Sequence, residues 1–194
     1  WDYSFKWKPA KFNTIDFLVS TKKNANGTDF IGSLFQNGTD VSSASQIPEY
    51  KTVILRVGFD EKKHGYINPY QDAIEDKVPL GENLEYKDKY VPMQFYPTEP
   101  SDYKAGICNL YLRDAEKNMY TEDGEIIEDN MIVEFKYDLT KEEQWRWVPL
   151  RVRYDKTAQF RAGEPNYGNA FHVANSNWHS IHNPITQTMI MTGD

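Results

Sequence analysis

The sequence predicts a mainly β protein, an OB-fold barrel with long loops, and three observations lead to this class. Several short runs alternate apolar and polar residues and are rich in β-branched and aromatic side chains, as strands are. Asn-Gly pairs and stretches rich in Gly, Pro and Asp separate these runs, as turns do. No long amphipathic helix is evident in the sequence. About five strands with long loops fit a small closed barrel better than a doubly wound sheet.

The expected elements follow one another along the chain. The strand-like runs are residues 5–9, 14–19, 51–59, 90–97, 107–112, 130–138 and 145–155. A short helix is expected at 68–76, where Asn68 is a suitable N-cap. One helical turn is expected at 138–144, capped by Asp138 or Thr140.

Composition limits the kind of protein and its partners. The 194 residues fit one medium domain or two small ones. The single cysteine, Cys108, excludes a disulfide framework and indicates a reducing compartment. No apolar run approaches the roughly 20 residues that cross a bilayer, so no membrane partner is expected. The Asn-Gly pairs at Asn26 and Asn37 indicate tight turns. The net charge of −7 argues against a protein that coats nucleic acid, but it allows a local phosphate site.

Charge is segregated along the chain. Acidic residues gather between positions 122 and 143, and a basic segment follows. Alternation along 145–155 places Arg151, Arg153 and Asp155 on one face of a strand. The apolar residues take the other face: Val148, Leu150, Val152 and Tyr154. The charged face is either a solvated surface or a phosphate site, because the planar fork of arginine suits phosphate oxygens.

A second pair of cations lies near the start of the sequence. In "FKWKP", Lys6 and Lys8 share one strand face and Trp7 points away. Two ammonium groups at this spacing can hold one phosphate. The alternative is an edge strand protected by its lysines.

Together, the two basic segments resemble one enzyme family. "FKWKP…NTIDF" resembles the lysine-bearing strand of the GTP:RNA guanylyltransferases, the mRNA capping enzymes. "IVEFKYD…WRWVPLRVRYDK" resembles the closing motif of that family, a Trp followed by R-x-R-x-D-K at the end of an OB-fold. The segments "VGFDEKKHGYINPYQD" and "YGNAFHVANSNWHSIHNPIT" look like the capping enzymes of large DNA viruses. The resemblance extends from about residue 5 to residue 190.

The resemblance implies a role for each matched residue. Lys6 and Lys8 match the lysines that hold the α-phosphate of the nucleotide, and Asp16 matches the acidic residue of the same motif. The motif that touches the β- and γ-phosphates of GTP is matched by Arg151, Arg153, Asp155 and Lys156. The catalytic candidates are therefore Lys6, Lys8, Arg151, Arg153, Asp155 and Lys156. The substrate-binding candidates are Lys6, Lys8, Asp16, Arg151, Arg153 and Lys156.

The resemblance also implies an activity and its partners. The OB domain would close as a lid over bound GTP, orient pyrophosphate for in-line departure and stabilise its charge. GTP and the RNA 5′ end would be the substrates, and the intact enzyme would use Mg²⁺ or Mn²⁺. The protein would be viral and would act in the host cytoplasm or in the virion.

The chain departs from the family at the nucleophile. The family uses a lysine in K-x-D-G, and no such motif occurs in the sequence; the Asp-Gly at 123–124 has Thr121 where lysine is needed. The chain alone is therefore expected to be inactive, to bind no cofactor by itself, and to need a nucleotidyltransferase lobe as partner. The expected division is residues 1–20 as the last strand of that lobe, 21–49 as a linker, 50–160 as the OB-fold domain, and 161–194 as an extension towards a methyltransferase domain.

Other functions remain open at this stage. The chain also suits the OB domain of an ATP-dependent polynucleotide ligase, a free-standing OB module for single-stranded nucleic acid, or a docking domain for a polymerase or methyltransferase subunit. The abundant aromatic residues either pack in the core or stack on bases: Tyr66, Tyr70, Tyr90, Phe95, Tyr96 and Trp178. The spacing of Cys108 and three histidines matches no standard zinc pattern, so no metal site is expected at His172, His179 and His182.

Overall fold

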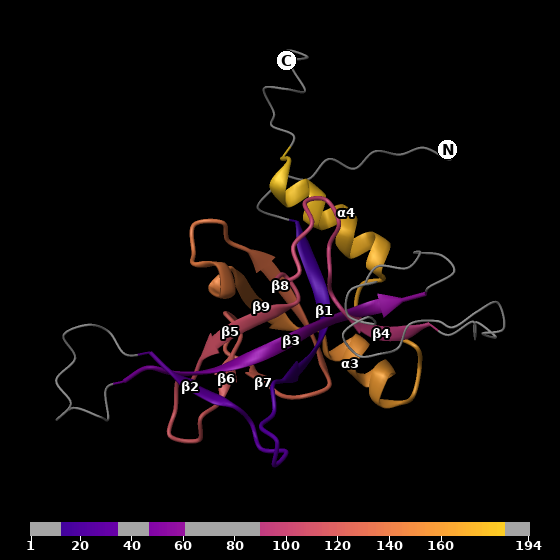
Figure 1. Ribbon diagram of the computed structural model, residues 1–194. Helices are drawn as coiled ribbons and strands as arrows, with labels where there is room; N and C mark the ends of the chain where they lie inside the picture. The colour runs from indigo at the N-terminus through magenta and orange to yellow at the C-terminus, as the bar shows by residue number, and fades with distance from the viewer. Residues whose placement is uncertain (1–12, 35–46, 61–89, 185–194) are drawn as a thin grey trace, which may run out of the picture.

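The computed structural model describes residues 13–34, 47–60 and 90–184. These residues form an antiparallel β structure with two α-helices (Figure 1). The predicted fold class, mainly β and OB-like, is therefore confirmed. The helix expected at 68–76 lies outside the described residues, as do Lys6 and Lys8.

One curled sheet forms the frame. Its middle strand is β1 (Thr14–Thr21), which pairs with β3 (Glu49–Phe59) on one side and with β8 (Met131–Tyr137) on the other. β5 (Ile107–Tyr111) pairs with the first half of β3, and β9 (Trp147–Val152) pairs with β8. The five longer strands thus lie in the order β5-β3-β1-β8-β9.

Shorter strands extend this frame. β2 (Ile31–Ser33) and β4 (Val91–Gln94) pair with opposite ends of β3. β6 (Met119–Tyr120) and β7 (Ile126–Ile127) form a separate hairpin. The Asn-Gly at Asn26 lies in a tight turn, as expected, with Gly27 at φ 83°. Asn37 lies outside the described residues.

Side-chain contacts bring the two ends of the sheet together. The Sγ of Cys108 on β5 lies 3.2 Å from the carbonyl oxygen of Trp147 on β9. Asn109 donates a 3.1 Å hydrogen bond to Gln144, which belongs to the 3-10 helix η3 (Glu143–Trp145) just before β9. The sheet therefore curls into a partly open barrel, the architecture expected of an OB-fold. The helical turn expected at 138–144 is found only as η3, which shares residues 143 and 144 with it, and its N-cap is Glu142 rather than Asp138 or Thr140.

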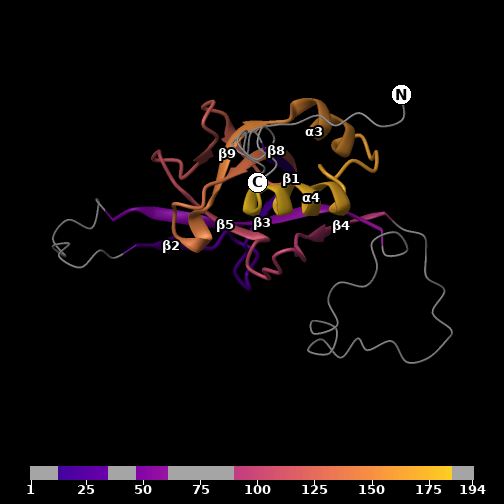
Figure 2. The same ribbon diagram turned by 90° about the horizontal axis from the view of Figure 1, so that it is seen from above.

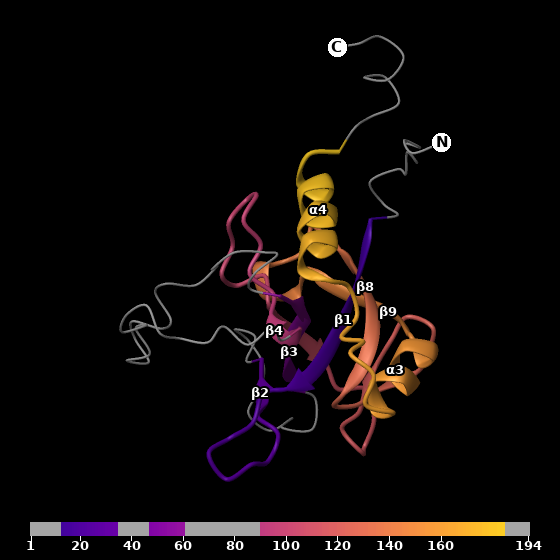
Figure 3. The ribbon, with the colours of Figure 1, turned by 90° about the vertical axis from the view of Figure 1, so that its right-hand side faces the viewer.

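Two helices follow the last strand. α3 (Tyr154–Arg161) lies beside β8, and α4 (Phe171–His182) crosses β1 and β3 (Figure 2). α4 stands at one end of the barrel and the β1–β2 connection at the other (Figure 3). The buried face of α4 closes the core at its end: Phe171, Ala174, Trp178 and Ile181.

Two sequence-based expectations need correction. Residues 14–20 do not belong to a preceding domain, because β1 is the middle strand of the sheet. The described part of the expected extension, residues 161–184, belongs to the domain, because Trp178 is 1% exposed and its Nε1 donates to the carbonyl of Pro100 at 2.9 Å. The domain is thus larger than the expected span 50–160, and the expected linker at 21–49 contains β2.

The basic strand is also shorter than expected. It ends at Val152, and α3 begins at Tyr154, which is 58% exposed although alternation placed it on the apolar face. The reason lies in the contacts of Ile132 on β8. The Ile132 carbonyl accepts a hydrogen bond from the Arg153 N–H, and the Ile132 N–H donates to the Thr157 hydroxyl. The Thr157 hydroxyl takes the N–H that a longer β9 would have bonded, so the strand ladder ends there.

Candidate phosphate-binding site

Two cations converge on one buried carboxylate. Arg153 Nη1 and Lys156 Nζ each lie 2.7 Å from the same oxygen, Oδ2 of Asp16. The Asp16 side chain is 7% exposed, and those of Arg153 and Lys156 are 27% and 24% exposed. We call Asp16, Arg153, Asp155 and Lys156 the Asp16 cluster. The fold brings together two motifs that lie about 140 residues apart in the sequence.

The end of β9 and the start of α3 position the two cations. Glu125 Oε2 accepts a 2.6 Å hydrogen bond from the Val152 N–H, and the Arg153 N–H donates to Ile132 at 2.7 Å. The hydroxyl of Thr157, which is 3% exposed, accepts from the Ile132 N–H at 2.9 Å. The first turn of α3 is therefore tied to β8, and Lys156 lies on that turn.

A loop between the helices holds Asp16. Beyond the part of β1 that pairs with β3, the edge of β1 at Asp16 is covered by Asn169. The Asn169 Oδ1 accepts from the Asp16 N–H, and the Asn169 N–H donates to the Asp16 carbonyl, both at 2.8 Å. Gly168 has φ +84°, and a Cβ there would lie 2.3 Å from the Asp16 carbonyl oxygen. The backbone of Asp16 is thus fixed on both sides of β1.

Asp155 and Arg151 complete the charged surface. Asp155 contacts Arg153 at 3.3 Å, as expected, and this hydrogen bond lowers the pKa of the Asp155 carboxyl. Arg151, whose side chain is 56% exposed, pairs with Glu134 at 2.6 Å. Burial raises the pKa of Glu134, but hydrogen bonds from Thr14 and Arg151 outweigh it, so the pKa is lowered overall.

The cluster can accept an anion only through donors that remain unused. Three cations face three carboxylates here, so the local charge is balanced: Arg151, Arg153 and Lys156 against Glu134, Asp16 and Asp155. A guanidinium has five N–H donors and an ammonium three. Arg153 directs donors of Nε, Nη1 and Nη2 at carboxylates, and Lys156 directs one. Both retain donors for phosphate oxygens.

The sequence missed several residues that build this cluster: Glu125, Thr157, Gly168 and Asn169. Gly168 and Asn169 lie in the segment "YGNAF", which carried the resemblance but suggested no role. Thr157 looks like any polar residue of a solvated helix. No local signal identifies these residues, because each acts on a strand that is remote in sequence.

Cys108 and two of the candidate aromatic residues are buried in the core. Burial raises the pKa of the Cys108 thiol, which keeps it protonated. In the three described ranges, no group of three or more His, Cys, Asp or Glu residues is placed to hold a metal ion. Phe95 and Trp178 are core residues, so packing is the correct reading for these two aromatics. No helix in the described part of the chain is long and apolar enough to cross a membrane.

Comparisons with known proteins identify the family. The family model described as "mRNA capping enzyme, C-terminal domain" matches residues 12–191. A "Probable mRNA-capping enzyme" of Acanthamoeba polyphaga mimivirus is 29% identical over 189 residues, which cover 96% of this chain. The chain spans 13% of that relative's length. No solved structure matches the chain. Because the family model covers nearly all of its residues, the chain belongs to the family of mRNA capping enzyme C-terminal domains.

Proposed function

We propose that this domain is the lid of an mRNA guanylyltransferase, which closes on GTP and orients its triphosphate through Arg153 and Lys156. The observation that carries the proposal is the Asp16 cluster, in which one buried carboxylate holds both cations beside each other with N–H donors to spare. The family membership supports a role in mRNA capping. A viral setting, host cytoplasm or virion, is proposed from the viral relative.

In this proposal the side chains position the triphosphate. Arg153 and Lys156 donate to oxygens of the β- and γ-phosphates and stabilise the charge that develops on departing pyrophosphate. Asp16 is a positioning residue, because it touches the cations and not the phosphates. Arg151 adds a more exposed cation, and Asp155 restrains the guanidinium of Arg153.

The reaction also needs groups outside the Asp16 cluster. Lys6 and Lys8 are proposed to hold the α-phosphate, as the resemblance implies. The nucleophilic lysine would come from a nucleotidyltransferase domain, since the sequence has no K-x-D-G. In the described part of this chain, no group of three or more His, Cys, Asp or Glu residues is placed to hold the Mg²⁺ or Mn²⁺ that the resemblance implies. The phosphate contacts proposed here are those of the protein's own cations.

The test is the Arg153→Ala variant in an enzyme that joins this domain to a nucleotidyltransferase domain. Formation of the enzyme–GMP adduct from labelled GTP should slow by about a hundredfold or more, as loss of one transition-state donor often does. Arg161→Ala is the matched control, because Arg161 is 52% exposed and only loosely paired with Glu128 at 3.9 Å. The control should label at the parental rate. An Arg153→Ala enzyme that melts early but labels normally would make the cluster structural and refute the triphosphate role.

The ligase alternative is less well supported, because the matching family is that of capping enzymes. The nucleotide preference of the intact enzyme, with its own nucleotidyltransferase lobe, tests it. Labelling by GTP and not by ATP supports capping, whereas labelling by ATP supports a ligase.

A further inference from the structure

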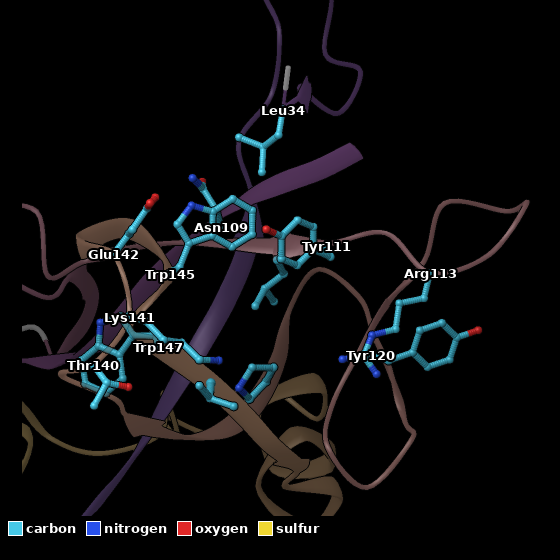
Figure 4. A pocket seen from close by; sticks show the side chains of 13 residues that line it. Leu34, Asn109, Tyr111, Arg113, Tyr120, Thr140, Lys141, Glu142, Trp145 and Trp147 are labelled. Atoms are coloured by element: carbon cyan, nitrogen blue, oxygen red, sulfur yellow. The ribbon is translucent and has the colours of Figure 1, made fainter. Parts of the chain in front are cut away.

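A cavity lies away from the Asp16 cluster. It has a volume of about 610 Å³ and opens between β5, η3 and the start of β9, where the two ends of the sheet meet (Figure 4). In the described part of the sheet, β5 pairs only with β3, and β9 pairs only with β8. The gap in the barrel therefore remains as a cleft. Its volume lies within the range of ligand sites, about 300–1,000 Å³.

An aromatic pair forms a platform in the cleft. The rings of Tyr111 and Trp145 stack with centroids 4.3 Å apart and planes at 26°. Tyr50 packs edge-on against Trp145 at 5.3 Å and holds that ring in place. Tyr111 is 47% exposed, whereas Trp147, which also lines the cleft, is 2% exposed. Tyr111 therefore presents ring surface to solvent, and every nucleobase has a face that stacks on such a ring.

Two cations flank the aromatic pair. Arg113 lies on one side of the rings and Lys141 on the other (Figure 4). Within the described residues, neither side chain forms a salt bridge or a hydrogen bond. Glu142 is the carboxylate among the lining residues. The cleft thus differs from the Asp16 cluster, where every cation already has a carboxylate partner.

We propose that this cleft binds the 5′ segment of single-stranded RNA, with one base stacked on Tyr111 and backbone phosphates at Arg113 and Lys141. A base within a strand has a phosphate on each side, which matches cations on both sides of the rings. The amide of Asn109 is already bonded to Thr52 and Gln144, so it does not read base edges. Stacking on an aromatic ring tolerates every base, so we expect little preference for base sequence. This inference deepens the proposed function and rests on it, since RNA is the acceptor in capping.

The binding test uses the 194-residue chain and a ten-nucleotide RNA with a 5′-triphosphate and a dye at its 3′ end. Fluorescence anisotropy should give an affinity that falls about tenfold or more in Tyr111→Leu, because stacking on one ring is lost. Arg113→Gln should reduce the slope of log K against log salt by about 0.7, the value for one phosphate contact in a single strand. Matched controls are Tyr103→Leu, at a tyrosine that is 76% exposed, and Arg161→Gln.

The outcomes are decisive. Weaker binding by both cleft variants with unchanged controls supports the site. Equal binding by parent and cleft variants overturns it, and so does no RNA binding by the parent at low salt, which would point to a protein partner for the cleft. Thermal melting of each variant shows that it is folded.

A second measurement separates this proposal from the lid function. In the joined enzyme, Tyr111→Leu should form the GMP adduct at the parental rate but transfer GMP to RNA slowly. Normal transfer by Tyr111→Leu would overturn the RNA cleft and leave the Arg153 result intact. Normal adduct formation by Arg153→Ala would overturn the lid function and leave the RNA-binding result intact.

Discussion

Asp16 is the residue on which the candidate site depends. Its carboxylate is nearly buried, and such a charge is costly unless it is paired. Arg153 and Lys156 supply that pairing by binding the same oxygen, so one carboxylate holds both cations beside each other. A triphosphate would meet two donors already at a fixed separation. Preorganisation of this kind removes an entropic cost from binding.

At the same scale, Glu134 predicts how stability depends on pH. Its carboxyl pKa is below the ordinary value of 4.5 in the folded state, despite burial, because Thr14 and Arg151 bond the carboxylate. The contribution of Glu134 to the free energy of unfolding is therefore complete above about pH 4.5 and is lost as the pH falls through the lower folded pKa.

Glu134→Gln should lose less stability than the parent between pH 6 and pH 3. Urea unfolding at several pH values measures this. Glu164→Gln, at an exposed carboxylate, should follow the parent; a Glu134→Gln curve parallel to the parental one would contradict the prediction.

The sequence identified the cations of the site but not their arrangement. Arg151, Arg153 and Lys156 were candidates because arginine and lysine suit phosphate and because the segment resembles a family motif. The shared contact of Arg153 and Lys156 with Asp16 was not predictable from spacing, because about 140 residues separate the partners. Only the resemblance placed Asp16 in the same site.

At the scale of elements, the boundary between β9 and α3 decides which way the cations point. Alternation along 145–155 predicted one continuous strand, and periodicity in so short a segment does not show where a strand stops. The stop is set by Thr157, which satisfies the N–H of Ile132 that a longer β9 would have bonded. Asp155 and Lys156 consequently project from a helical turn.

The loop between α3 and α4 gives a test of this arrangement. Gly168→Ala should destabilise the domain for two reasons, the positive φ and the close approach of the new Cβ to the Asp16 carbonyl. Gly163→Ala is the matched control, because Gly163 has φ +86° and a Cβ at that position would meet nothing within 4 Å. Both variants carry the backbone cost of about 1–2 kcal/mol. Gly168→Ala should lose about 1–3 kcal/mol more, as overpacking does. Equal free energies of unfolding in urea would show that the loop does not press on β1.

At the scale of the whole molecule, one strand joins the two proposed sites. Trp147, Val148 and Pro149 at the start of β9 line the aromatic cleft, and Arg153 follows its end. The frame that holds β9 was predicted as a class, a barrel of about five strands, because alternation and turns report directly on strands. The boundaries of the domain were not predicted. Neither the pairing of β1 with β3 and β8 nor the packing of Trp178 leaves a local pattern in the sequence.

The domain boundaries give the last prediction. A fragment of residues 50–160 should not fold, although it contains β3, β5, β8 and β9. It lacks β1, whose Phe17 is fully buried and whose ring packs against those of Phe95, Phe135 and Trp147 at 5.0–5.9 Å. Without β1, the facing edges of β3 and β8 lose their partners. Removal of one large core side chain costs about 3–5 kcal/mol, whereas a whole domain is stable by only about 5–15 kcal/mol.

The fragment also lacks α4, so the faces of Trp147 and Phe95 that pack against Trp178 would be exposed to water. Far-UV circular dichroism and thermal melting of the fragment should show no cooperative transition. A chain of residues 13–184 is the control, since it contains every described element and the same internal loops, and it should melt cooperatively. A cooperative transition in the 50–160 fragment would mean that β1 and α4 are additions to a self-sufficient barrel. The Asp16 cluster would then join two independent units, and the proposed lid would move without Asp16.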